Sequence, residues 1–237
     1  MTVALSYTDG KHAFIIADSC ASDALNQSLV KNPKVFNPVG RKDVLIGCAG
    51  TFRLPNLLKY VPNVFPSESE LATEDINMSY LVNEFTPVMK ALTADFEDED
   101  VWEMLIAVGD RIYRMQMDLS IIEPADCCES IGCGGSVALG AFKVLNELEP
   151  DMPIEERMKH ALKVACDTVQ GCSAPFSIMK TEDIPNDVRA NIPKDRKKTM
   201  GYEIIRSSDD GDLEIELEEI SKKEKSSKQK KKKIKKH

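Results

Sequence analysis

Residues 1–18 contain two apolar runs separated by a turn sequence. Residues 3–7 (Val-Ala-Leu-Ser-Tyr) and 13–17 (Ala-Phe-Ile-Ile-Ala) flank the pair Asp9-Gly10. An Asp-Gly pair between two apolar runs is typical of a tight β-hairpin. Such a hairpin returns the chain, so Asp18 at the end of the second run is predicted to lie beside the start of the first. The fold is therefore expected to include a buried antiparallel pair at the N-terminus.

Thr2 follows Met1 directly. Methionine is removed in cells when the next side chain is small, and removal here would give Thr2 both a hydroxyl and a free α-amine. An α-amine has an unperturbed pKa of roughly 8 and is able to accept the hydroxyl proton, so the residue is a nucleophile with its own base. A Met-Thr start is by itself also an ordinary chain start, and the residues that follow decide between the two interpretations.

Three later segments carry further candidate residues. Residues 32–36 bring Lys34, and residues 43–50 form an apolar run that ends in small residues and contains Gly47. Residues 130–136 (Ser-Ile-Gly-Cys-Gly-Gly-Ser) are rich in glycine. The short apolar run at 43–50 is consistent with a buried strand.

Together these residues resemble the proteasome β-subunit family, and in particular its HslV-like peptidases, which are N-terminal-nucleophile (Ntn) hydrolases. The resemblance covers about residues 2–180. It makes Thr2 the N-terminal threonine and Asp18 the aspartate that closes the second strand. It makes Lys34 the buried lysine and Gly47 the glycine whose N–H helps to form the oxyanion hole.

The glycine-rich segment and one helix add two assignments to this resemblance. Residues 130–136 are similar to the family's segment that opens a helix, and Asp167 falls where the family often places another acid near the threonine. Cys133 replaces the usual serine of that segment, and Gln170 replaces a second supporting serine. Both positions help to orient the threonine amine, so Cys133 is included among the expected catalytic positions.

The resemblance implies a threonine peptidase mechanism that needs no cofactor or metal. The Thr2 hydroxyl attacks the scissile carbonyl, and the Thr2 amine takes the proton. The positive charge of Lys34 lowers the pKa of that amine, and Asp18 pairs with Lys34. The N–H of Gly47 stabilises the developing oxyanion, and water hydrolyses the resulting ester.

A substrate pocket is expected beside the oxyanion glycine. Leu45 is two residues before Gly47, so the two share a face of a strand. The resemblance places Leu45 at the floor of the pocket for the residue that precedes the cut. With Ala21 and Ala49 it predicts a medium-sized apolar pocket that prefers Leu, Tyr or Phe over Arg or Asp.

A second functional class stays open: a catalytically inactive structural subunit of a proteasome-like shell. The replacements at Cys133 and Gln170 support it. An idle scaffold, however, has no chemical need of a buried lysine paired with an aspartate, because burying such a pair carries a desolvation cost. The joint presence of Lys34 and Asp18 therefore favours the active enzyme.

The charge distribution divides the chain of 237 residues into an expected domain and a tail. The whole chain carries −8, and residues 221–237, with ten lysines and one glutamate, carry +9, so residues 1–220 carry −17. A block of like charge is expected to be disordered. We therefore predict one HslV-like domain over 1–220 and a disordered Lys-rich tail over 221–237. The tail is expected to act as a solubilising segment, because no aromatic residues interleave its lysines to stack on bases. The alternative is a contact with nucleic acid or with an acidic partner.

Composition also bears on location. No apolar run approaches the ~20 residues of a membrane span, and the start lacks the basic and small-residue pattern of a signal peptide. The seven cysteines are odd in number and have no C-x-x-C spacing. They indicate reduced thiols in a cytoplasmic protein and no zinc site.

Helical and strand patterns predict an α+β fold. Helices are expected near 51–61, 78–96, 134–147 and 153–169, with a kink at Pro87 inside the second. Later strands are expected at 103–108, 111–117, 177–181, 202–206 and 213–217. This order of blocks argues against alternating β-α-β units. The resemblance implies the specific form: a four-layer αββα sandwich of two antiparallel sheets flanked by helices.

The resemblance also implies self-assembly and partners. Family members close into rings that hide the threonines inside a chamber, so we expect a homo-oligomeric ring of six or seven subunits, in a double ring, served by an AAA+ unfoldase ATPase and degrading unfolded polypeptides. The first two expected helices carry apolar residues on more than one face, which suggests contacts beyond one core. These residues are Leu54, Leu57, Leu58, Tyr60, Tyr80, Leu81, Val82 and Phe85.

Overall fold

The computed structural model describes residues 1–22, 26–31 and 33–182. The strands expected at 202–206 and 213–217 and the Lys-rich segment at 221–237 lie outside the described residues. The remaining expected elements fall within the described residues.

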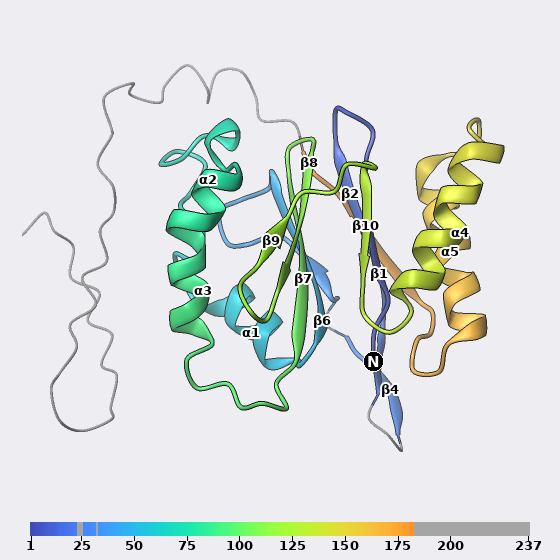
Figure 1. Cartoon of the computed structure of the whole chain (residues 1–237), viewed down its shortest axis with the longest axis horizontal. Coiled ribbons are helices and arrows are strands. Elements are labelled where there is room, and N and C mark those ends of the chain that lie inside the picture. The colour runs from blue at the N-terminus through green and yellow to red at the C-terminus, as the bar shows by residue number, and fades with distance from the viewer. Residues whose placement is uncertain (23–25, 32, 183–237) are drawn as a thin grey trace, which may run out of the picture. The chain divides into compact units, whose positions relative to one another are not determined.

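Two antiparallel sheets lie face to face between two layers of helices (Figure 1). The first sheet has the strand order β10-β1-β2-β11, with β1 Ala4–Thr8, β2 Ala13–Asp18, β10 Cys128–Ile131 and β11 Phe176–Lys180. The second has the order β5-β6-β7-β8-β9, with β5 Val35–Phe36, β6 Val44–Gly50, β7 Trp102–Val108, β8 Arg111–Gln116 and β9 Ile121–Ile122. A small hairpin of β3 Cys20–Ser22 and β4 Gln27–Leu29 extends beyond β2.

The helices cover the two outer faces of this pair of sheets (Figure 1). One outer layer holds α1 Arg53–Tyr60, the 3₁₀ turn Thr73–Asp75, α2 Met78–Tyr80, the π-helical turn Leu81–Phe85 and α3 Thr86–Leu92. The other holds α4 Gly135–Leu148 and α5 Ile154–Thr168. The α+β fold with antiparallel sheets is thus confirmed, in the four-layer arrangement that was expected.

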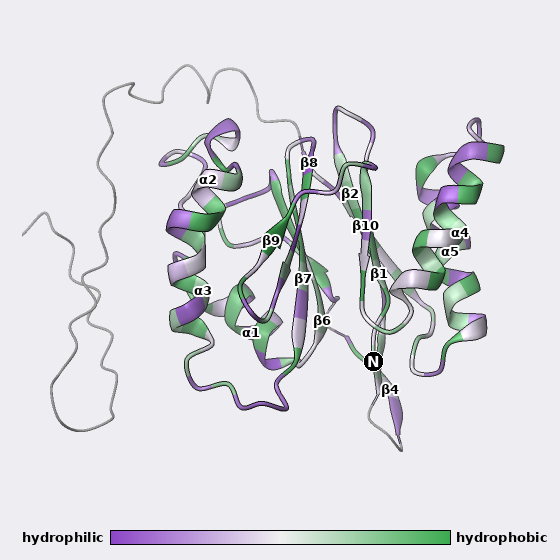
Figure 2. Ribbon diagram, viewed as in Figure 1, coloured by the Kyte–Doolittle hydropathy of each residue, from purple (hydrophilic) through white to green (hydrophobic). Residues whose placement is uncertain are grey.

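Strand alternation gives this sandwich three apolar interfaces. On β6, Val44 and Ile46 face the helix layer, while Leu45 lies between the sheets. On β2, Phe14 packs toward α4 and α5, whereas Ile15 lies between the sheets. Successive side chains of a strand point to opposite faces, so continuous apolar runs are what strands buried on both faces require. Figure 2 shows the corresponding apolar colouring along the strands and on the sheet-facing sides of the helices.

The turn between β1 and β2 is the tight hairpin turn that was expected. Thr8 pairs with Ala13, and Asp9 N–H donates to the carbonyl of His12 at 3.1 Å, so Gly10 and Lys11 form its tip. The Asp9 carboxylate accepts hydrogen bonds from the N–H groups of Lys11 and His12, each at 2.8 Å. The aspartate therefore closes the turn with its side chain, as Asx turns do.

The predicted kink at Pro87 takes the form of a π-helical turn over Leu81–Phe85. Proline has no N–H to donate and its ring crowds the preceding turn, so the α-helical pattern cannot continue unchanged through it. The Thr86 hydroxyl donates to the carbonyl of Leu81 at 2.9 Å and satisfies one displaced acceptor. One π turn before the proline accommodates the irregularity.

Candidate active site

Thr2, Asp18 and Lys34 form one buried cluster at the start of β1. Lys34 Nζ donates to Thr2 Oγ1 at 2.8 Å and to Asp18 Oδ1 at 2.8 Å. The three residues are 3%, 0% and 3% exposed. The pairing of β1 with β2 brings the first two together, since Asp18 N–H donates to the carbonyl of Val3. The proximity predicted from the hairpin is confirmed.

Asp18 is held by the main chain as well as by Lys34. Its Oδ1 also accepts from Val3 N–H at 3.0 Å, and its Oδ2 accepts from Cys20 N–H at 3.0 Å and Ser173 N–H at 3.3 Å. These hydrogen bonds fix both carboxylate oxygens of Asp18 in position against Lys34.

Lys34 enters the cluster from the chain just before β5. Its carbonyl accepts a hydrogen bond from Cys48 N–H on β6 at 3.2 Å, which fixes the backbone at the sheet edge. Its ammonium also lies 3.4 Å from the carbonyl oxygen of Met1. The first sheet supplies Thr2 and Asp18, and the edge of the second supplies Lys34, so this site exists only when the two sheets pack together.

The glycine-rich segment before α4 packs on the carbonyl of Thr2. Gly134 N–H donates to that oxygen at 3.3 Å, and the Cys133 thiol donates to it at 3.4 Å. Gly132 has φ of +83°, and a Cβ built there would lie 2.3 Å from the same oxygen. Only glycine fits this backbone at position 132, because both its conformation and its surroundings exclude a side chain. Cys133 thus takes a supporting position beside the threonine.

Gly47 has a packing role in the structure. A Cβ at this position would lie 2.9 Å from Ile15 Cγ2, so the glycine allows the two sheets to approach. Cys48 N–H points to β5, where it meets the carbonyl of Lys34, and neighbouring residues of a strand direct their N–H groups to opposite sides. The N–H of Gly47 is therefore directed to β7, away from the edge that carries Lys34.

Gly50, which the sequence patterns did not single out, ends the same strand at that edge. By the alternation that governs Cys48, its N–H is directed to the side of β5. It has φ of +99°, and a Cβ there would lie 2.0 Å from the carbonyl of Val101. The preceding Ala49 lies against Gly132 on the threonine side, with 3.3 Å between its Cβ and a Cβ built on Gly132.

The expected pocket residues divide into two groups. Leu45 is fully buried between the two sheets, where it has no access to a substrate. Ala49 is also buried, and Ala21 is half-buried in the hairpin that follows Asp18. The predicted role of Leu45 as the pocket floor is thus not supported by its position.

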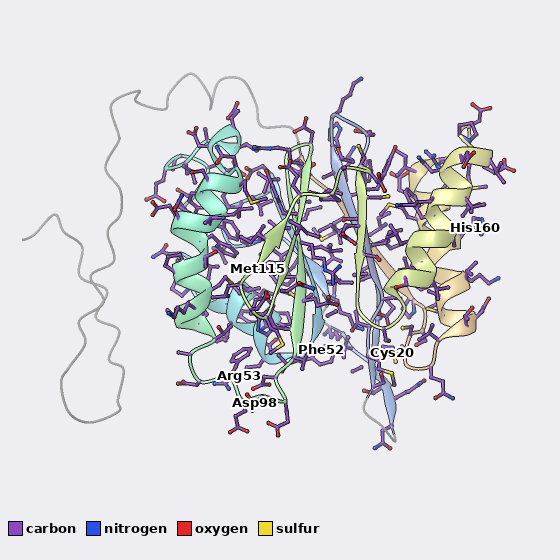
Figure 3. All side chains as sticks on the ribbon, in the orientation of Figure 1. Cys20, Phe52, Arg53, Asp98, Met115 and His160 are labelled. Carbon is purple, nitrogen blue, oxygen red and sulfur yellow. The ribbon has the colours of Figure 1, made fainter. Side chains whose placement is uncertain are left out.

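A shallow hollow beside Lys34 lies closer to the cluster than Leu45 does. It is lined by Pro33, Lys34, Phe36, Phe52, Pro55, Asn56 and Lys59. Phe52 is 40% exposed, and Figure 3 places it and Cys20 at the same end of the two sheets. The aromatic and proline walls are apolar, while Lys59 adds a second cation at the border. In the sequence, the position of Phe52 shortly after the apolar run that forms β6 is the signal that could have found this hollow.

Asp167 does not join the cluster in the described structure. It is exposed near the end of α5 and lines a groove between α4 and α5, which also includes His160, labelled on the outer helix layer in Figure 3. Gln170 is exposed as well. Cys166, the residue before Asp167, faces the site instead. Burial together with the charge of Asp18 raises the pKa of the Cys166 thiol to about 11.

Glu103 on β7 is a further residue that the sequence patterns missed. Its Oε2 accepts a hydrogen bond from Gly132 N–H at 3.0 Å, and its other oxygen pairs with Arg114 on β8. Arg114 also lies 3.9 Å from Glu129, so its charge is shared between two carboxylates. Glu103 therefore connects the second sheet to the turn that packs on the Thr2 carbonyl.

Met1 covers the backbone nitrogen that the proposed chemistry needs. The Thr2 hydroxyl donates to the carbonyl of Met1 at 2.7 Å, and the amino group of Met1 donates to the carbonyl of Ser22 at 3.1 Å. A Cβ built on Gly171 would lie 2.6 Å from Met1 Cε. Met1 thus lies against both Thr2 and the hairpin that contains Ser22.

Among residues 1–22, 26–31 and 33–182, no three His, Cys, Asp or Glu side chains are grouped closely enough to hold a metal ion. Over the same part of the chain, no helix is both long and apolar enough to span a membrane.

No family model matches the sequence, but solved structures share the fold. BPH from Thiobacillus denitrificans superposes with a TM-score of 0.60 at 18% identity, covering 78% of this chain and 100% of that chain. HslV from Trypanosoma brucei gives 0.57 at 17% identity, with 76% and 99% covered. Anbu, an ancestral β-subunit from Yersinia bercovieri, gives 0.56 at 12% identity, with 75% and 81% covered.

These identities are low, so the similarity concerns the fold. The neighbours have the same four-layer architecture as this chain. The chain therefore shares the α+β fold of these HslV-like structures.

Proposed function

We propose that this chain is an N-terminal threonine endopeptidase, the proteolytic subunit of a self-compartmentalised, HslV-like protease that degrades unfolded polypeptides. The observation that carries the proposal is the position of Lys34 Nζ, within 2.8 Å of both the Thr2 hydroxyl and the Asp18 carboxylate. A buried ammonium that donates to a hydroxyl oxygen stabilises negative charge on that oxygen, which suits an oxygen nucleophile activated by a separate base. The neighbours HslV and BPH, the latter also solved in complex with epoxomicin, give the same fold a peptidase context.

The mechanism begins with the removal of Met1. This frees the Thr2 amine and takes away the carbonyl that now accepts the hydroxyl proton. Thr2 Oγ1 then attacks the scissile carbonyl while the amine accepts its proton. The Lys34 charge keeps the neighbouring amine neutral and stabilises the oxygen as its proton leaves, and Asp18 fixes Lys34. Water hydrolyses the ester in the second half of the reaction.

We assign the oxyanion donor to Gly50 in place of Gly47. The N–H of Gly50 is directed to the strand edge that carries Lys34, whereas that of Gly47 is directed to β7. One such donor contributes roughly 3 kcal/mol to transition-state stabilisation in other hydrolases. Gly132 and Gly134 shape the support on the opposite side of Thr2 through its carbonyl.

The hollow beside Lys34 is the proposed pocket for the residue that precedes the cut. Phe36, Phe52 and Pro55 give it apolar walls, and Lys34 and Lys59 border it with positive charge. This favours Leu, Tyr or Phe over Arg, since a cationic substrate side chain would meet two like charges.

Assembly is the second half of the proposal. We propose a closed homo-oligomer of six or seven subunits per ring, in a double ring, served by an AAA+ unfoldase. The helices α1 to α3 expose Tyr60 at 64% and Val82 at 49%, while Leu54, Leu58, Leu81 and Phe85 form the core. Exposed apolar side chains on a helix layer support a protein contact. We also propose that the domain extends over residues 1–220. We propose a cytoplasmic location as well, because the seven cysteines are free thiols.

An inactive shell subunit is the rival function, favoured by Cys133 and Gln170 at positions where the family has serines. The experiment that separates the two is chemical. Intact-mass measurement of the purified protein should show the loss of Met1, and incubation with epoxomicin should add the inhibitor's mass to wild type but not to Thr2→Ala. A protein with a free Thr2 that epoxomicin does not modify would support the shell subunit.

A further inference from the structure

The loops on either side of the threonine cluster bring two cysteines together. Cys133 Sγ lies 3.6 Å from Cys172 Sγ, although the residues are 39 positions apart. Cys133 precedes α4, and Cys172 follows α5. Gly134 allows this contact, because a Cβ there would lie 3.2 Å from Cys172 Sγ and 2.8 Å from Val3 Cβ.

The two thiols have different access to solvent. Cys133 is exposed, whereas Cys172 is 6% exposed. Burial raises the pKa of the Cys172 thiol, as does its contact with Cys133. An exposed thiol beside a buried partner is the arrangement in which the first meets an oxidant and the second resolves the product.

Each cysteine also adjoins one part of the candidate site. The Cys133 thiol donates to the Thr2 carbonyl at 3.4 Å. Ser173, next to Cys172, donates its N–H to Asp18 Oδ2 at 3.3 Å. A covalent bond between the two cysteines would therefore connect the loop that contacts Thr2 to the loop that contacts Asp18.

We propose that Cys133 and Cys172 form a reversible disulfide that switches off the threonine site. The switching effect rests on the proposed peptidase function, whereas formation of the disulfide does not. In a reducing compartment such a bond forms only when a peroxide is present, which makes it a redox sensor and not a structural cross-link.

The reaction balances with hydrogen peroxide as the oxidant. The Cys133 thiolate attacks one peroxide oxygen, the O–O bond breaks, and hydroxide leaves and takes up the thiol's proton as water. The Cys172 sulfur then attacks the sulfenic sulfur of Cys133. The S–S bond forms, the S–O bond breaks, and the hydroxyl leaves as water with the Cys172 proton. Two thiols are oxidised, one peroxide is reduced to two waters, and a dithiol reductant reverses the change.

The disulfide would disturb the site in two ways. It removes the S–H that donates to the Thr2 carbonyl, and it draws two loops in contact with Thr2 and Asp18 toward each other. A small misplacement at a reacting centre has a large effect on rate. We therefore expect the oxidised enzyme to be at least about tenfold slower than the reduced enzyme.

The first measurement is independent of activity. The full-length protein is reduced, freed of reductant, treated with hydrogen peroxide and alkylated, and its peptides are mapped by mass spectrometry. A linked pair of peptides containing Cys133 and Cys172, lost after treatment with a dithiol, is the expected result. No such link, or a link from Cys172 to Cys166 instead, would overturn the proposal.

The second measurement follows cleavage of a fluorogenic peptide before oxidation, after it and after reduction. Wild type should lose activity and recover it, while Cys172→Ser, which cannot form the bond, should lose less activity than wild type. Cys127→Ser is the matched control and should respond like wild type, because Cys127 is exposed but adjoins the opposite end of β1. A cross-linked protein as active as the reduced one would overturn the switch. Inactivity of fully reduced wild type would count against the peptidase function and leave the disulfide to be decided by the peptide map.

Discussion

The ammonium nitrogen of Lys34 lies 2.8 Å from the hydroxyl oxygen of Thr2. The lysine reaches this oxygen from the edge of one sheet, while the threonine lies two residues before β1 of the other. Because the ammonium donates, it stabilises negative charge on the threonine oxygen and cannot act as its base while charged. The base must come from another group, which is the role given to the Thr2 amine after removal of Met1.

Thr2→Ala should abolish hydrolysis of a fluorogenic peptide, because the attacking oxygen is lost. Thr2→Ser should keep part of the activity, since serine retains both the hydroxyl and the amine. Light scattering should show the same assembly for all three proteins, because Thr2 is 3% exposed and belongs to the subunit interior. An alanine variant that cleaves as fast as wild type would disprove the mechanism.

Asp18→Ala should destabilise the fold by about 3–5 kcal/mol, because it leaves the buried Lys34 charge without its partner. It also leaves three backbone N–H groups without an acceptor. Urea unfolding measures the change. The control is Glu182→Ala, which breaks the Lys42–Glu182 pair, 3.9 Å apart and exposed at 76% and 66%. An exposed pair contributes about 0–1 kcal/mol, so equal effects of the two substitutions would contradict the prediction.

Glu103→Gln should lower kcat by about tenfold or more with little change in KM, because Gly132 is held less firmly against the Thr2 carbonyl. The free energy of unfolding should fall by only about 1.5–3 kcal/mol, the range for a hydrogen bond to a charged group. The control is Glu147→Gln on the exposed surface of α4. A fall in stability without any fall in kcat would give Glu103 a structural role alone.

Lys59→Glu should raise cleavage after Arg relative to cleavage after Leu, because it replaces one of two cations at the proposed pocket with an anion. The reversal removes one repulsion and adds one attraction, each worth up to about 1 kcal/mol at a partly exposed position, so the ratio of kcat/KM values should shift about fivefold or more. Lys163→Glu on α5, which lines the groove between the outer helices, is the matched control. If wild type preferred Arg, or if Lys59→Glu left the ratio unchanged, the pocket for the residue that precedes the cut would have to lie elsewhere.

The protein should form closed oligomers whose association strengthens with salt over a modest range. Residues 1–220 carry −17, and ions screen the repulsion between such subunits. Light scattering over a salt series measures the effect, with Val82→Asp as a variant that adds charge to an exposed apolar position of the helix layer. A monomer at every concentration and ionic strength would refute the chambered protease even if Thr2 proved reactive.

The local sequence determined the hairpin that sets Asp18 beside the first strand, and the nature of most elements. The alternating burial of β2 and β6, the helix boundaries near 135–148 and 154–168, and the disturbance before Pro87 all follow from spacing and from proline chemistry. These are short-range effects, which a sequence expresses directly.

Tertiary packing decided the details of the site. The direction of the Gly47 N–H depends on which strand lies on each side of β6, and the burial of Leu45 depends on how closely the two sheets approach. Glu103 and Cys172 contact the loop beside Thr2 from positions distant in sequence, so no local sequence pattern predicts their roles. Residue spacing therefore predicted that Thr2, Asp18 and Lys34 lie together, whereas the groups that contact them became visible only when the sheets and loops were packed.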